Sequence, residues 1–212
     1  DGIMKALLVN GSPHKNGCTH TALNIVGDSL RENGIEVDEF WIGNKPIAGC
    51  IGCGTCSKGE GCVYKDDKVA EFQSIAGDYD AFVFGSPVYY AGVAGSMKSF
   101  MDRAFYSNRG NVSFARKPAA VIASARRGGT TATLEQLEKH LQITQMYQVT
   151  SCYWPMIHGN TPEETVQDEE GVQTMQVLGA NMAWLMKALE AARAAGIEEP
   201  PAIKKARTNF IR

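Results

Sequence analysis

The sequence has no apolar run that approaches the roughly 20 residues needed to cross a bilayer. We therefore expect no membrane partner. The formal net charge is only −2, which provides no electrostatic case for a nucleic-acid partner. The N-terminus lacks the basic region and the long apolar stretch of a signal peptide. We expect a cytoplasmic protein, in which thiols stay reduced and structural disulfides are not expected.

Two common nucleotide-binding motifs are also missing. The chain contains neither GxGxxG nor GxxxxGK[ST], so neither a dinucleotide fold nor an ATPase loop is indicated. Hydrophobic residues make up 44% of the 212 positions, which excludes a disordered chain and suffices for a large core. This length suits one α/β domain. We expect that domain over residues 4–196, followed by a C-terminal tail or arm over residues 197–212.

Short apolar runs alternate with helical patterns five times along the chain. The expected strands cover residues 5–10, 36–41, 81–85, 118–124 and 147–153. The expected helices cover residues 19–33, 66–76, 95–103, 131–143 and 172–195. This alternation is typical of an α/β fold with one parallel sheet and helices on both faces. Ligands of such folds bind beyond the carboxyl ends of the strands, which directs attention to the loops after the first, third and fourth strands.

The loop after the first strand, NGSPHKNGCTHT, has the features of an anion site. Ser12 and Thr19 offer hydroxyls, and His14 and Lys15 can add positive charge. The N-terminus of the following helix presents backbone N–H groups and a partial positive charge to this loop. A phosphate site is one interpretation. The other is an ordinary polar loop in which Thr19 caps the helix.

The next two loops suggest a planar ligand. Tyr89 and Tyr90 follow the third strand, where they suit a wall against a flat aromatic ring. Packing inside the protein or at a subunit contact is the alternative. After the fourth strand, Gly128 and Gly129 let backbone N–H groups come close to a ligand edge, beside a pair of arginines that either neutralise an anion or stay solvated. Together the three loops describe a mononucleotide with a planar ring.

These stretches, above all SPVYYAGVAGSMKSFMDR, resemble the flavodoxin-like NAD(P)H-dependent FMN reductase family over residues 4 to about 159. The resemblance implies a five-stranded parallel sheet in the order 2-1-3-4-5 with helices on both faces, bound FMN and NAD(P)H as cosubstrate. It assigns the FMN phosphate to Ser12, His14, Asn16, Cys18 and Thr19. It assigns the ribityl chain and ring to Pro87, Val88, Tyr89, Tyr90 and Gly92. It assigns the pyrimidine edge to Ser124, Arg126, Gly128 and Gly129.

Four of the six cysteines follow the spacing C-x2-C-x2-C-x5-C, at Cys50, Cys53, Cys56 and Cys62. The first three match the opening of a ferredoxin-type run, but the fourth lies further on than in a ferredoxin. Within the family, the spacing resembles that of the iron–sulfur flavoproteins, which implies a [4Fe–4S] cluster and a homodimer or homotetramer. A cysteine-rich subunit contact with bare thiols and a structural zinc site are the alternatives.

The resemblance implies an FMN-dependent oxidoreductase that passes reducing equivalents from NAD(P)H through FMN to a small acceptor. The flavin supplies the chemistry, so no catalytic side-chain acid or base is expected. A first alternative is an iron–sulfur flavoprotein that relays electrons between FMN and the cluster, with a small molecule or a redox protein as acceptor. A second is a non-redox protein that binds another phosphorylated ligand on the same fold.

Overall fold

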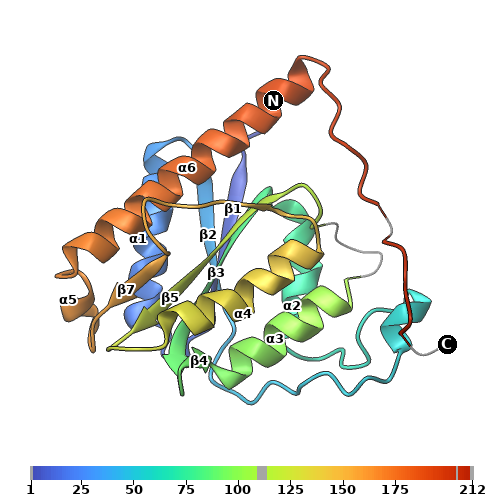
Figure 1. Cartoon of the computed structure of the whole chain (residues 1–212), viewed down its shortest axis with the longest axis horizontal. Helices are drawn as coiled ribbons and strands as arrows, with labels where there is room; N and C mark the ends of the chain where they lie inside the picture. The colour runs from blue at the N-terminus through green and yellow to red at the C-terminus, as the bar shows by residue number, and fades with distance from the viewer. Residues whose placement is uncertain (1, 109–113, 204, 211–212) are drawn as a thin grey trace.

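The computed structural model describes residues 2–108, 114–203 and 205–210 and shows a central sheet covered by helices on both faces (Figure 1). The sheet follows the path β2-β1-β3-β5-β6, and β4 and β7 pair off this path with β3 and β5. The strands are β1 (Lys5–Asn10), β2 (Glu36–Trp41), β3 (Ala81–Tyr89), β4 (Gly92–Val93), β5 (Pro118–Ala125), β6 (Tyr147–Gln148) and β7 (Met156–His158). All pairs except β3–β4 are parallel.

Among the described residues the sheet has seven strands rather than the expected five. The expected order 2-1-3-4-5 is therefore incomplete, because β4 and β7 are added beside the path β2-β1-β3-β5-β6. One addition arises because the chain turns back after β3 at Tyr90 and Ala91, which both have positive φ, and forms β4. The other arises because the strand expected over 147–153 stops at Gln148. The chain returns to β5 only after Pro155, whose nitrogen carries no hydrogen for a sheet ladder.

Helices pack on both faces because the central strands are apolar on both sides. The helices are α1 (Cys18–Glu32), α2 (Lys68–Ile75), α3 (Gly95–Tyr106), α4 (Thr130–Ile143), α5 (Pro162–Thr165) and α6 (Glu169–Ala194), with 3-10 turns at Thr55–Lys58 and Ala76–Asp78. Leu8 of β1 faces the core under α1 and α6, whereas Leu7 faces the core under α2, α3 and α4. The carboxyl ends of the strands are left between these two layers for a ligand.

Aspartate side chains decide where two of the helices begin. The helix expected from residue 66 starts at Lys68, because the Asp67 carboxylate accepts hydrogen bonds from the backbone N–H groups of Val69 and Ala70. The helix expected from residue 172 starts at Glu169, because Asp168 accepts a hydrogen bond from the N–H of Gly171.

The segment after α6 runs along the body without helix or strand in its described parts, 197–203 and 205–210. Arg116 donates from Nε and Nη2 to the carbonyl oxygens of Pro200 and Pro201, at 3.1 and 3.3 Å. Gln145 and Ile203 exchange two further hydrogen bonds. Positions 204, 211 and 212 of the expected tail lie outside the described residues.

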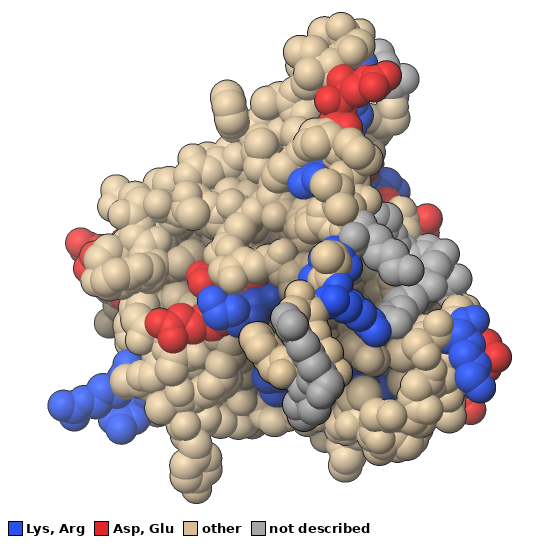
Figure 2. Space-filling view, turned by 45° about the vertical axis from the view of Figure 1, so that its right-hand side comes forward, with Lys and Arg blue, Asp and Glu red and all other residues tan. Residues whose placement is uncertain are grey.

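None of the helices in the described part of the chain combines the length and the apolar character that crossing a bilayer requires. On the face shown in Figure 2, the described basic and acidic side chains form small separate groups rather than one extended patch. This face therefore offers no broad electropositive surface of the kind that a polyanion requires.

Candidate functional site

The carboxyl ends of β1, β3 and β5 open into a cleft of about 730 Å³, within the roughly 300–1,000 Å³ typical of ligand pockets. Ten of the fourteen residues assigned to FMN line it: Ser12, His14, Asn16, Cys18, Thr19, Pro87, Val88, Tyr89, Ser124 and Arg126. The rest of the lining comes from Lys15, Gly17, Ala125, Gly159, Asn160, Thr161 and Pro162. Segments distant in sequence therefore meet at the edge of the sheet where a ligand is expected.

The other four assigned residues, Tyr90, Gly92, Gly128 and Gly129, are described but do not line this cleft. Tyr90 lies at the tip between β3 and β4 and is fully exposed. Gly129 has a φ of +100°, and a Cβ there would lie 2.5 Å from the Cα of Ala91. Gly129 thus lets the start of α4 pack against the β3–β4 turn, which is a structural reason for glycine at this position.

The loop between β1 and α1 is held from beneath by buried side chains. Asn10 is fully buried. Its Oδ1 accepts a hydrogen bond from the N–H of Ser12 at 3.0 Å, and its Nδ2 donates to the carbonyl of Lys15 at 3.1 Å. Trp41 donates from Nε1 to the carbonyl of Ser12 at 2.8 Å. These bonds fix the backbone of the loop before any ligand arrives, which lowers the entropic cost of binding.

The N-terminus of α1 faces the cleft with free hydrogen-bonding capacity. Its N-cap is Gly17, so the interpretation in which Thr19 caps the helix is wrong. Among the described residues, no side chain caps this helix start, and its first turn contains no acidic residue. By contrast, carboxylates cap both α2 and α6. An uncapped helix N-terminus presents N–H groups and partial positive charge to an anion.

Thr19 and Ser124 join the two sides of the cleft floor. Their hydroxyl oxygens are 2.8 Å apart, and both side chains are buried. The bond ties the first turn of α1 to the end of β5. Thr19 and Ser124 therefore stabilise the cleft through this hydrogen bond, and both residues also line it.

We expect Ser124→Ala to lower the free energy of unfolding by about 1–3 kcal/mol, because the buried hydroxyl of Thr19 loses its partner. Urea denaturation followed by circular dichroism measures the change. The double variant Thr19→Val/Ser124→Ala removes both polar groups and is expected to recover part of the loss. A double variant less stable than Ser124→Ala would contradict this explanation.

The segment that follows β7 also lines the cleft. Gly159 donates its N–H to the carbonyl of Ala125 at 3.0 Å, and its carbonyl accepts from Cys18 Sγ at 3.7 Å. A Cβ on Gly159 would lie 2.5 Å from the backbone nitrogen of Thr165, so glycine is required for this approach. The sequence did contain one signal, since Thr161 followed three residues later by Glu164 is typical of a helix start. Thr161 indeed caps α5.

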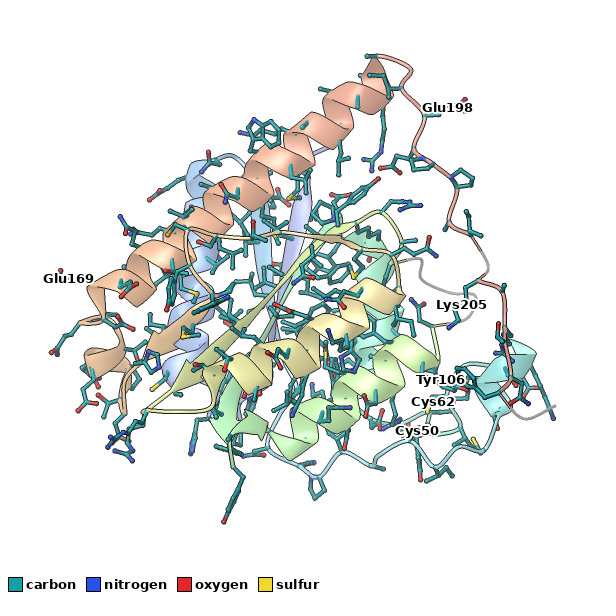
Figure 3. The ribbon with its side chains drawn as sticks, viewed as in Figure 1. Cys50, Cys62, Tyr106, Glu169, Glu198 and Lys205 are labelled. Atoms are coloured by element: carbon teal, nitrogen blue, oxygen red, sulfur yellow. The ribbon has the colours of Figure 1, made fainter. Side chains whose placement is uncertain are left out.

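A second cavity lies between residues 50–62, here called the cysteine loop, and the end of α3. All four clustered cysteines line it, together with Ile51, Gly52, Gly54, Val63, Tyr64, Arg103, Tyr106 and Ser107. Figure 3 shows Cys50 and Cys62 close together beside Tyr106. Cys56 is buried, whereas Cys50 and Cys53 are exposed. The hydrogen bond with Thr55 lowers the pKa of the Cys53 thiol, which favours the thiolate that binds metals.

Arg103 connects this cavity to the core. Its Nε and Nη2 each donate to Cys62 Sγ at 3.4 Å. Its Nη1 donates to Asp67 Oδ2 at 2.5 Å. Burial acts to lower the pKa of Arg103, but Asp67 and Cys62 outweigh it and raise that pKa, so the guanidinium remains charged. No sequence pattern pointed to this role, because Cys62 lies 41 positions away in the chain.

The four cysteines at positions 50, 53, 56 and 62 form one candidate donor set for a metal centre. Within the described residues, no three His, Cys, Asp or Glu side chains converge closely enough to hold one metal ion. Yet four cysteines share one cavity, and none of the six cysteines, all described, forms a disulfide. In a [4Fe–4S] cluster each thiolate binds a different iron, so the sulfurs need not converge as they do around one tetrahedral zinc. Four thiols that line one cavity provide the number and kind of donors that a [4Fe–4S] cluster requires.

Comparison with known proteins relates the chain to a family and to a fold. A sequence model of the NADPH-dependent FMN reductases matches residues 4–161. An iron-sulfur flavoprotein of Methanocaldococcus jannaschii is 31% identical over 186 residues, which cover 82% of this chain and 92% of that protein. A second one from the same organism is 29% identical over 196 residues, covering 88% and 100%. A flavodoxin from the domain Archaea superposes with a TM-score of 0.58 at 17% identity, over 87% of this chain and 99% of that one, which shows a flavodoxin-like fold.

Proposed function

The chain belongs to the NADPH-dependent FMN reductase family, within its iron–sulfur flavoprotein subgroup, and from this premise we propose that FMN occupies the cleft at the ends of β1, β3 and β5. Membership makes the protein an FMN-dependent oxidoreductase. The observation that carries the placement is that ten residues from three separate segments of the chain line one cleft. The non-redox alternative loses its support with the family assignment.

In this placement the phosphate lies against the loop of residues 12–19 and the N-terminus of α1. The uncapped start of α1 supplies N–H donors, and the hydrogen bond from the N–H of Ser12 to Asn10 holds the loop in place. The ring lies along residues 87–89, where Tyr89 provides an apolar wall, and its pyrimidine edge faces residues 124–126. Tyr90, Gly92, Gly128 and Gly129 then act on the ring only through the β3–β4 turn that Gly129 supports.

FMN, when bound, supplies hydride and single-electron transfer. The residues of this chain bind and orient it, exclude water from one face of the ring and present positive charge. Arg126 and the backbone N–H groups at the end of β5 lie where negative charge on a reduced ring is stabilised. This arrangement requires no side-chain acid or base, in agreement with flavin-based chemistry.

The same proposal places a [4Fe–4S] cluster on Cys50, Cys53, Cys56 and Cys62 as a second cofactor that exchanges single electrons with FMN. The shared cavity and the names of the relatives support it. Reducing equivalents enter from NADPH or NADH and leave to a small molecule or a redox protein. If the loop carries no cluster, the protein is a flavin reductase with a cysteine-rich contact loop.

Anaerobic purification and reconstitution with iron and sulfide test both cofactors. One FMN per chain that NAD(P)H bleaches supports the cleft placement, and a protein that binds no added FMN overturns it. Stoichiometric iron and sulfide support the cluster. Accessible cysteines without bound iron overturn the cluster and leave the flavin reductase.

Self-association as a homodimer or homotetramer is a further part of the proposal. Trp184 on α6 is 71% exposed, and Tyr153 and Trp154 form an exposed edge-to-face pair before β7. Large exposed aromatic groups favour burial against another surface. Light scattering coupled to size exclusion measures the mass, and a monomer at micromolar concentration would contradict association.

A further inference from the structure

Arg103 is the largest fully buried side chain of the described protein, with 1% of its surface exposed. It lies on α3 in the stretch SFMDR, next to Asp102, whose own partners are Lys98 and His140. Arg103 lines the cavity of the cysteine loop. A buried arginine is costly to the fold unless its charge and its N–H groups are matched.

Every side of the guanidinium group has a contact. Nη1 donates to the Asp67 carboxylate and, at 3.2 Å, to the carbonyl of Ala48. The ring of Tyr64 lies 4.7 Å from the guanidinium carbon. Nε and Nη2 together point at one atom, Cys62 Sγ. The orientation of the group is therefore fixed by the protein.

Two N–H groups of Arg103 donate to the same sulfur, that of Cys62, which is an unusual acceptor for a guanidinium group. A planar fork of this kind usually matches a carboxylate or a phosphate. Here the carboxylate of Asp67 receives one donor, whereas the sulfur receives two. A neutral thiol is only a weak acceptor, whereas the ligand sulfurs of a metal cluster accept hydrogen bonds that tune the cluster, so the two N–H groups lie where a ligand sulfur would use both of them.

We propose that Arg103 is a positioning residue that orients Cys62 and raises the reduction potential of the cluster, an inference that rests on the cluster of the proposed function. Hydrogen bonds to ligand sulfurs and nearby charge both set such potentials. Reduction adds one electron and no proton, and a fixed positive charge stabilises the more negative product. Asp67 opposes this effect with its own negative charge.

Four variants separate these contributions. Arg103→Met removes charge and donors, Arg103→Lys keeps the charge without the fork, and Asp67→Asn removes the opposing charge while keeping a side chain that caps α2. Lys98→Met is the matched control, because it removes one positive charge from the same helix, where Lys98 pairs with Asp102 rather than with a cysteine. Each protein is reconstituted anaerobically, analysed for iron, sulfide and melting temperature, and titrated for the potentials of cluster and FMN.

We expect Arg103→Met to lower the equilibrium constant for cluster reduction about tenfold or more, which is about 59 mV for one electron. Arg103→Lys is expected to cause a smaller fall, Asp67→Asn a rise, and Lys98→Met no change. The potential of FMN serves as internal reference. If Arg103→Met fails to fold, the opposite shifts of Arg103→Lys and Asp67→Asn decide the question.

Two failures are distinguishable. Iron-loaded variants whose cluster potentials equal the wild-type value, or shifts of the same sign in Arg103→Lys and Asp67→Asn, overturn the role of Arg103 and leave the proposed cofactors intact. A wild-type protein that takes up no iron overturns the cluster itself, and with it this inference, while its FMN content still tests the flavin site.

Discussion

Cys56→Ser is expected to abolish stoichiometric iron binding in the reconstituted protein and to leave one FMN per chain. Cys56 is only 7% exposed and lines the cavity shared by the four clustered cysteines. A [4Fe–4S] cluster requires four thiolates, and a serine hydroxyl is a far poorer ligand for iron. Serine preserves most of the side-chain volume, so the fold is expected to persist. Iron, labile sulfide and flavin are measured per chain after anaerobic reconstitution.

The controls for this experiment come from the two cysteines outside the loop. Cys152→Ser changes an exposed cysteine in the segment before β7, and Cys18→Ser changes a cysteine in the FMN cleft. Both are expected to keep full iron content. Among the described residues the two cavities share no lining residue, so iron and FMN are expected to be lost independently. Wild-type iron content in Cys56→Ser would contradict the role of Cys56 as a cluster ligand. Loss of FMN together with iron would contradict two separate sites.

The central strands could be predicted because a strand that is buried on both faces appears in the sequence as a continuous apolar run. The apolar runs of β1, β3 and β5 follow directly from sandwiching between helices. The edge of the sheet has no such apolar run, because β6 is only two residues long and is followed by exposed aromatic residues. The turn into β4 places Tyr90 and Ala91 at positive φ, a conformation that sequence patterns assign to glycine or asparagine.

The same distinction applies to the site. The position of the loop between β1 and α1 could be predicted because the loop and the helix start that follows it are contiguous in the chain, whereas its role as an anion site stays a prediction. Gly159 reaches Cys18 across 141 positions, and Arg103 reaches Cys62 only after α3 and the cysteine loop have packed together. An arginine in a helical pattern indicates a solvent-exposed face by default. Arg103 is buried only because distant segments pack around it, and no local sequence pattern predicts such burial.

Asn16→Asp is expected to weaken FMN binding roughly 30-fold, or about 2 kcal/mol. The substitution keeps the shape of the side chain and adds one negative charge to the cleft wall beside the proposed phosphate position. Two unit charges about 4 Å apart repel by roughly 1 kcal/mol in water and roughly 4 kcal/mol near a protein surface. Asn16 is exposed, so an intermediate value applies. Flavin fluorescence titration of the apoprotein measures the dissociation constant.

The apoprotein of Asn16→Asp is expected to unfold at the wild-type temperature or slightly above it, because a carboxylate near the N-terminus of α1 interacts favourably with the helix dipole. Weaker FMN binding without weaker folding then identifies charge repulsion as the cause. Asn44→Asp adds the same charge at an exposed position outside the cleft and is expected to bind FMN normally. Raising the salt concentration is expected to reduce the difference in FMN dissociation constant between Asn16→Asp and the wild type, because salt screens the repulsion. Equal affinities at low salt would place the phosphate elsewhere, because a negative charge at this loop could then have no anion to repel.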